Sequence, residues 1–81
     1  MQRDFSNLRR PLQPMPGYIA EALQREGLIE QYEARPAYQQ NDYLSWITRA
    51  VREETREKRL RQMLEELKKG GVYMRMAWKG Q

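Results

Sequence analysis

The sequence contains no cysteine and no histidine. Without cysteine, neither disulfide bonds nor thiolate metal sites can supplement the core. Without histidine, the chain lacks the commonest metal ligand and the usual general base at neutral pH. Any chemistry would therefore depend on carboxylates or lysines.

Long apolar runs are also missing. No stretch approaches the roughly 20 residues that a helix needs to span a bilayer. The N-terminal sequence MQRDFSNLRRPLQPMPG contains no apolar run of signal-peptide length. We therefore expect a cytoplasmic protein without a transmembrane segment.

Recognisable catalytic and cofactor-binding motifs are absent as well. The sequence has no glycine-rich phosphate loop, no HExxH-type metal pair, and no serine that could be matched with a histidine. Carboxylates such as Glu53 and Glu57 would be well solvated on a helix surface, without the burial that raises the pKa of a general acid. We expect no catalytic, metal-binding or cofactor-binding residues, and a protein that is not an enzyme.

What is present fits one small domain with a mild basic excess. The chain has 81 residues, and a domain of this size buries only about 60% of the surface that its unfolded chain exposes. Fifteen Lys and Arg against eleven Asp and Glu give a net charge of +4, which favours acidic partners without identifying one. The chain leaves no room for a deep substrate pocket.

The first half of the sequence predicts an arm and two short helices. Closely spaced prolines in residues 1–15 favour an extended N-terminal arm. A first helix is predicted over 17–26, because Pro16 suits a helix start and Gly27 suits a C-terminal cap. A helix of two turns or less follows before Pro36, which disfavours helical geometry at the preceding residue.

The second half predicts two longer helices between residues 37 and 69. Apolar residues step by three and four from Tyr43 to Val51 and again from Leu60 to Leu67. No proline or glycine interrupts the segment, so one continuous rod is compatible with local signals. A rod would leave too few elements to cover both apolar stripes, and we therefore predict a bend near 52–53. Lys68, Lys69 and Gly70 mark the end of the last helix.

The sequence VYMRMAWK, in the C-terminal tail at 72–81, alternates as a half-buried strand does. A single strand has no partner within a helical chain. The favoured interpretation is an extended tail that packs Val72 or Met74 on the helices. The alternative is strand addition to another chain, or self-association through residues 72–79.

Two features are candidates for partner binding. Four arginines spaced three, four and three apart would align along one side of a continuous helix and track phosphates or acidic headgroups: Arg49, Arg52, Arg56 and Arg59. Interleaved glutamates favour the plainer interpretation, a solvated helix face with ion pairs, and a bend at 52 would divide the stripe. Tyr43 and Trp46 could offer an aromatic anchor or a stacking platform, although core packing is the simpler role for both in a domain with one phenylalanine.

Several segments together resemble the YdeI/OmpD-associated family over about residues 15–71. They are the opening MPGYIAEAL, the segment YLSWI, the basic segment ETREKR and the ending LKKGG. The most specific part is a joint spacing of six residues: Tyr43, Trp46, Ile47, Thr55, Arg56 and Arg59. The chain departs from the family pattern at 35–41, where RPAYQQN replaces a Ser-Pro-Ser-like helix start, and at Glu53, where many members have proline.

The resemblance implies a compact bundle of about four helices and brings the labels of bacteriocin protection and antimicrobial-peptide resistance. These labels name phenotypes rather than chemistry. The sequence thus predicts an all-α protein with an arm at 1–15, a helical domain at 16–71 and a tail at 72–81. We expect a non-enzymatic interaction module whose basic face and Tyr43/Trp46 region bind an unknown protein. The alternative is binding of nucleic acid or an anionic surface through the basic helix face.

Overall fold

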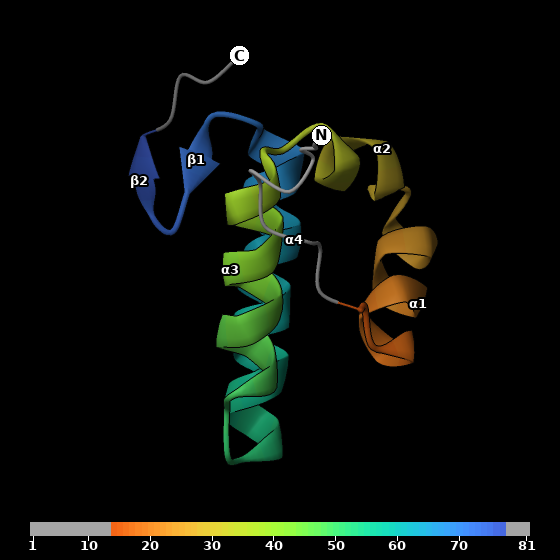
Figure 1. The fold of residues 1–81 in the computed structure, drawn as a ribbon, viewed down its shortest axis with the longest axis vertical. Helices are drawn as coiled ribbons and strands as arrows, with labels where there is room; N and C mark the ends of the chain where they lie inside the picture. Colours follow the sequence, from red (N-terminus) through yellow and green to blue (C-terminus); the bar gives the residue numbers. More distant parts are fainter. Residues whose placement is uncertain (1–13, 78–81) are drawn as a thin grey trace, which may run out of the picture.

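The computed structural model describes residues 14–77, and these form four helices followed by a small β-hairpin (Figure 1). The helices are α1 (Gly17–Glu26), α2 (Ile29–Glu33), α3 (Ala37–Thr48) and α4 (Glu53–Lys69). The strands are β1 (Val72–Tyr73) and β2 (Met76–Ala77). The helical bundle predicted from the sequence is confirmed. Of the arm predicted for 1–15, residues 1–13 lie outside the described residues, and Met15 packs against the core.

Two prolines and two glycines set several helix boundaries. Pro16 and Pro36 adopt extended geometry at the N-caps of α1 and α3, where their missing N–H costs nothing and their carbonyls accept the first helical hydrogen bonds. Gly27 and Gly70 end α1 and α4 at positive φ, which is strained for residues with a Cβ. The predicted bounds 17–26 and the predicted end of the last helix are therefore confirmed.

The bend between the two long helices is confirmed without a helix-breaking residue. Helix α3 ends at Thr48 and α4 begins after Arg52, whose backbone is extended. Buried Ala50 fixes the turn from the inside, and Glu53 and Glu54 complement the dipole at the start of α4. The two helices consequently lie side by side in opposite directions, with the turn 49–52 at one end of the molecule (Figure 1).

The core lies where the inner faces of all four helices meet. Its buried residues are Ile19, Leu23, Leu28, Tyr32, Tyr43, Leu44, Ile47, Met63 and Leu67. Burial of apolar area of this kind stabilises a fold by about 25 cal/mol per Å². The two stripes that suggested a bend from the sequence therefore face one another across the α3–α4 pair.

The predicted extended tail at 72–81 is wrong in that residues 72–77 pair with one another, but Met74 packs against the core as predicted. Residues 72–77 form an antiparallel hairpin, with Val72 opposite Ala77 and Tyr73 opposite Met76. The strand pairs within the same chain, so self-association through residues 72–79 is not needed to give its backbone a hydrogen-bonding partner. Residues 78 and 79 lie outside the described part of the chain. The hairpin sits against the C-terminal end of α4 (Figure 1).

Candidate functional site

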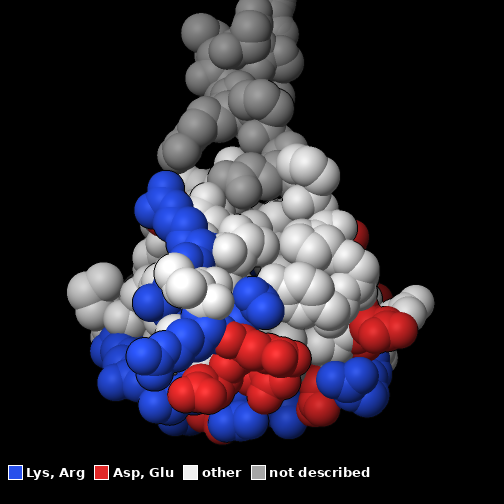
Figure 2. Space-filling model, turned by 90° about the horizontal axis from the view of Figure 1, so that it is seen from below, with Lys and Arg blue, Asp and Glu red and all other residues white. Residues whose placement is uncertain are grey.

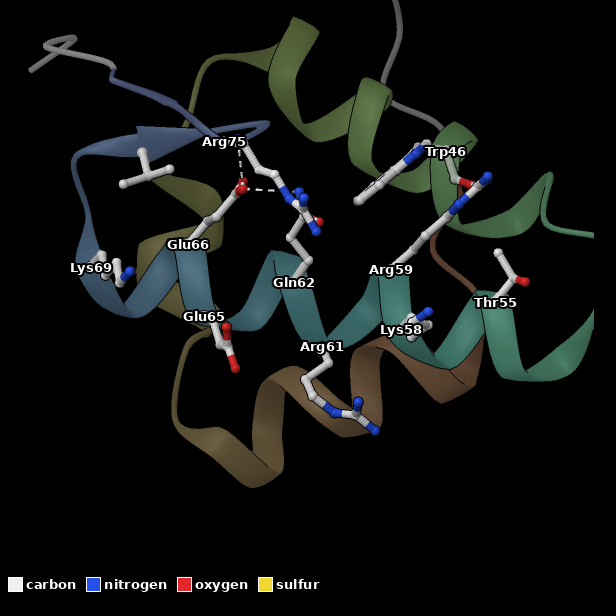
Figure 3. A pocket seen from close by; sticks show the side chains of 11 residues that line it. Trp46, Thr55, Lys58, Arg59, Arg61, Gln62, Glu65, Glu66, Lys69 and Arg75 are labelled. Atoms are coloured by element: carbon white, nitrogen blue, oxygen red, sulfur yellow. Dashed lines mark hydrogen bonds between the residues drawn. The ribbon is translucent and has the colours of Figure 1, made fainter.

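A groove of about 670 Å³ extends along α4, between the end of α3 and the hairpin (Figure 3). This size lies within the range of ligand-binding clefts. Its lining residues are Trp46, Thr55, Lys58, Arg59, Arg61, Gln62, Glu65, Glu66, Lys69, Val72 and Arg75. We call this feature the α4 groove.

The α4 groove carries a local excess of positive charge. Five of its lining residues are Lys or Arg, and two are glutamates. Among the described residues, none of these five cations forms an ion pair with a carboxylate; the ion pair that does form joins Lys68 to Glu26. One of the two glutamates, Glu66, is 4% exposed and has its carboxylate engaged inside the protein. The groove therefore presents mainly unpaired cations to solvent.

Trp46 and Arg59 meet at one end of the groove. The Arg59 guanidinium donates a hydrogen bond of 2.6 Å from Nη1 to the main-chain carbonyl of Trp46. Its central carbon lies 5.4 Å from the Trp46 ring centroid, within the range of a cation–π contact. Both side chains are partly buried, so they form a fixed edge that is still open to solvent. The sequence singled out both residues, and the fold brings them together.

Arg75 enters the groove from the hairpin. Its Nε donates to Gln62 Oε1 at 3.1 Å, and the residue is exposed. Figure 3 shows Arg75 and Arg59 on the Trp46 side of α4, whereas Arg61 and Glu65 lie on the other side. The sequence analysis missed Arg75, because the tail carries no turn signal that would direct this side chain back to α4.

The hairpin turn is held by the carboxylate of Glu66. This side chain accepts hydrogen bonds from the backbone N–H groups of Met74 and Arg75, both at 2.8 Å, from Gln62 Nε2 at 3.0 Å, and from the Tyr43 hydroxyl. Met74 and Arg75 both have positive φ, which points successive N–H groups toward one acceptor. A sequence signal for Glu66 existed: it lies three residues after Met63, on the buried face of the helix.

A buried arginine, Arg35, also connects the hairpin to the helices. Arg35 is 5% exposed and donates to the carbonyls of Glu66 at 3.1 Å and Val72 at 2.9 Å. It also donates to Gln39 Oε1 at 3.0 Å, within the segment that departs from the family pattern. Arg35 thus ties the start of α3, the end of α4 and β1 together.

Tyrosines complete this polar network and remain neutral over a wide pH range. Burial, and then the hydrogen bond to the Glu66 carboxylate, raise the pKa of Tyr43 well above its ordinary value. Burial and the 2.5 Å hydrogen bond to Asp42 raise the pKa of Tyr73 in the same direction. Burial raises the pKa of Tyr32 to about 12. The rings of Tyr43 and Tyr73 also pack edge to face, with centroids 5.5 Å apart.

The predicted arginine stripe is divided. Arg49 and Arg52 are exposed in the turn between the helices. Arg56 lies over the ring of Tyr18 at 5.9 Å, in a second groove between α1 and α4 that also carries four glutamates. Only Arg59 reaches the α4 groove. Figure 2, which views the turn end of the molecule, shows a cluster of acidic side chains bordered by Lys and Arg rather than one basic surface.

The fold also corrects the predicted aromatic region. Tyr43 is fully buried, so its ring belongs to the core and cannot contact a partner in this structure. Trp46 alone remains at the surface of the predicted pair. The partly exposed anchor is therefore Trp46 with Arg59, rather than Trp46 with Tyr43.

The described residues contain no cluster of three or more acidic side chains placed to hold a metal ion. Within residues 14–77, the helices are too short or too polar to cross a bilayer.

The family model described as "Bacteriocin-protection, YdeI or OmpD-Associated" matches residues 14–70. No significant match was found among curated proteins or among solved structures. The match covers all four helices and ends just before the hairpin.

Proposed function

The chain belongs to the bacteriocin-protection, YdeI or OmpD-associated family, and we propose that it acts there as a non-enzymatic interaction module. In this proposal the α4 groove binds an acidic segment of a partner protein in the cytoplasm. We propose that this binding serves protection against bacteriocins, as part of a stress or antimicrobial-peptide response, because the family description names bacteriocin protection.

The observation that carries the proposal is the pairing of Trp46 with Arg59 in a groove of unpaired cations. Tryptophan and arginine are the residue types most enriched at the energetic centres of protein interfaces. Arg59 is already oriented by its bond to the Trp46 carbonyl, so little side-chain freedom is lost when a carboxylate binds.

Charge distribution favours an acidic protein segment over a long polyanion. A nucleic acid gains affinity from cations that follow its phosphates over several nucleotides. The cations here form a short cluster, and the four predicted arginines are split between the turn, the second groove and the α4 groove. The acidic cluster in Figure 2 would repel a backbone that continued around α4.

We propose that the protein has no catalytic activity, because its inward-facing carboxylate and hydroxyl groups are already engaged in hydrogen bonds. Glu66 already accepts four hydrogen bonds, and the raised pKa values of Tyr43 and Tyr73 keep these hydroxyls protonated far above neutral pH. These groups are committed to holding the hairpin. They offer no free acid or base to a substrate.

Binding to nucleic acid or an anionic surface is the second candidate. It draws support from the turn 49–52, where Val51 is 95% exposed between the exposed Arg49 and Arg52. An apolar side chain flanked by two cations suits contact with an anionic lipid surface.

Affinity capture from a bacterial lysate tests both candidates. Tagged protein is compared with Arg59→Gln and Arg52→Gln, which lose the same charge inside and outside the groove. We expect a discrete protein that survives nuclease treatment and is lost in Arg59→Gln but retained in Arg52→Gln. Recovery of nucleic acid alone, lost at high salt, would replace this proposal by the second candidate.

A further inference from the structure

We infer that the hairpin is a specificity element of the α4 groove, in which Arg75 and Arg59 together recognise two acidic residues spaced two apart in an extended peptide. This inference rests on the proposed function, because it names the chemistry of the segment that the groove binds. It also assigns a binding role to a part of the chain that lies beyond the family match at residues 14–70.

The position of Arg75 is fixed by its own backbone. Its N–H and that of Met74 converge on the Glu66 carboxylate, and Arg35 holds the carbonyl of Val72. Tyr73 adds a 2.5 Å hydrogen bond to Asp42 on α3. The turn is therefore tied to α4, to α3 and to the connection between α2 and α3, and the Arg75 side chain begins from a defined place at the edge of the groove.

The side chain of Arg75 is directed along α4 while its end stays available. Its Nε is bonded to Gln62, which leaves the two terminal nitrogens without a partner among the described residues. A guanidinium oriented in this way can bind a carboxylate by donating two parallel hydrogen bonds to its oxygens. The hydrogen bond to Gln62 thus orients the guanidinium while leaving its positive charge available to a ligand.

Arg59 and Arg75 can engage two anions from the same side of α4. Gln62, which holds Arg75, follows Arg59 by three residues, or about 4.5 Å along the helix axis. Both arginines lie on the Trp46 side of α4 (Figure 3). In an extended peptide, side chains two residues apart lie on one face, about 6.6–6.8 Å apart. A segment with acidic residues at alternate positions would present both carboxylates to this side of α4, whereas adjacent acidic residues would face opposite ways.

Fluorescence anisotropy with two labelled decapeptides tests the inference. GSGELEGSGS carries alternate glutamates, and GSGEELGSGS has the same composition with adjacent glutamates. Each is titrated against the full chain and against Arg75→Gln, with Arg52→Gln as the matched control that loses the same charge in the turn 49–52, outside the groove. Circular dichroism confirms that both variants retain the fold, which is expected because both side chains are exposed.

We expect the full chain to prefer the alternate peptide. Arg75→Gln should weaken its binding by roughly tenfold or more and remove the preference, while Arg52→Gln changes it less than about threefold. Equal losses in the two variants, or equal binding of both peptides, would overturn the inference. So would a thymidine decamer that competes with the same dependence on Arg75, because the site would then be a general anion site.

Failure of the inference and failure of the proposed function give different results. If neither peptide binds but a captured protein still depends on Arg59, the groove binds a partner and the recognition of alternate acidic residues is wrong. If capture is indifferent to Arg59, the groove is not the binding site and the proposed function itself fails.

Discussion

The two ends of the α3–α4 pair are similarly rich in charge but use it differently. At the end where α3 begins and α4 ends, Arg35 and Glu66 are buried and engaged in hydrogen bonds that hold the hairpin. We call this the locked end. At the open end, the turn 49–52, Arg49 and Arg52 are exposed to solvent. Charge in the sequence therefore does not reveal which charged groups build the fold and which remain available to a partner.

The difference follows from the position of each residue relative to the core. Glu66 lies on the buried face of α4, so its charge must be satisfied by donors before the helix can pack. Arg49 and Arg52 flank a helix break, where water solvates them fully. Only the first kind of residue carries a large free-energy penalty when it is changed.

The strongest test of this comparison replaces Glu66 and its neighbour Glu65. We expect Glu66→Ala to lower the free energy of unfolding by about 3–5 kcal/mol, because it leaves the Tyr43 hydroxyl and the two hairpin N–H groups without their acceptor. Glu65→Ala, on the exposed side, should change it by less than about 0.5 kcal/mol. Urea unfolding followed by circular dichroism measures both values. Equal losses of stability in Glu66→Ala and Glu65→Ala would show that the Glu66 carboxylate does not stabilise the locked end.

Alkaline unfolding probes the tyrosines near the same end. Folded Tyr32 keeps its proton up to a pKa of about 12, whereas the unfolded chain loses it near 10. The unfolded state then binds fewer protons, so the free energy of unfolding falls as pH rises from 10 to 12, by about 1.4 kcal/mol per pH unit for this residue. Tyr32→Phe should remove that part of the slope. An unchanged slope in urea titrations over this range would mean that Tyr32 ionises normally in the fold.

The smallest effect is expected at the open end. The double variant Arg49→Gln with Arg52→Gln should leave the free energy of unfolding within about 0.5 kcal/mol of the original protein, because exposed charges contribute little. Thermal unfolding at low salt measures the difference. A loss above about 1 kcal/mol would mean that these arginines stabilise the turn, and the contrast between the two ends would no longer hold.

Much of the helical fold could be predicted from the sequence because its signals are local. Pro16, Gly27, Pro36 and Gly70 set boundaries through their own backbone preferences, and the apolar spacing identified the buried faces. The bend could be predicted only from the need to cover both apolar stripes, because no residue in 49–52 breaks a helix by itself.

The hairpin could not be predicted in the same way. Two-residue turns of this kind usually contain glycine, asparagine or aspartate at positive φ, whereas Met74 and Arg75 occupy these positions here. Their strained backbone is stabilised by a carboxylate on α4, a tertiary contact that no local pattern reveals. Arg75 was missed for this reason: Trp46 and Arg59 lie within recognisable helices, but Arg75 depends on a turn that Glu66 imposes.

The hairpin also separates two boundaries that are often assumed to coincide. The family match stops at residue 70, so a chain shortened there would retain all four helices. It would also lose two of the hydrogen-bond donors to Glu66 and the Val72 carbonyl that Arg35 binds. The segment matched by the family model is thus shorter than the segment that supplies hydrogen-bond partners to the buried side chains of Arg35 and Glu66. Transplanting these helices into a fusion protein requires carrying residues 71–77 with them.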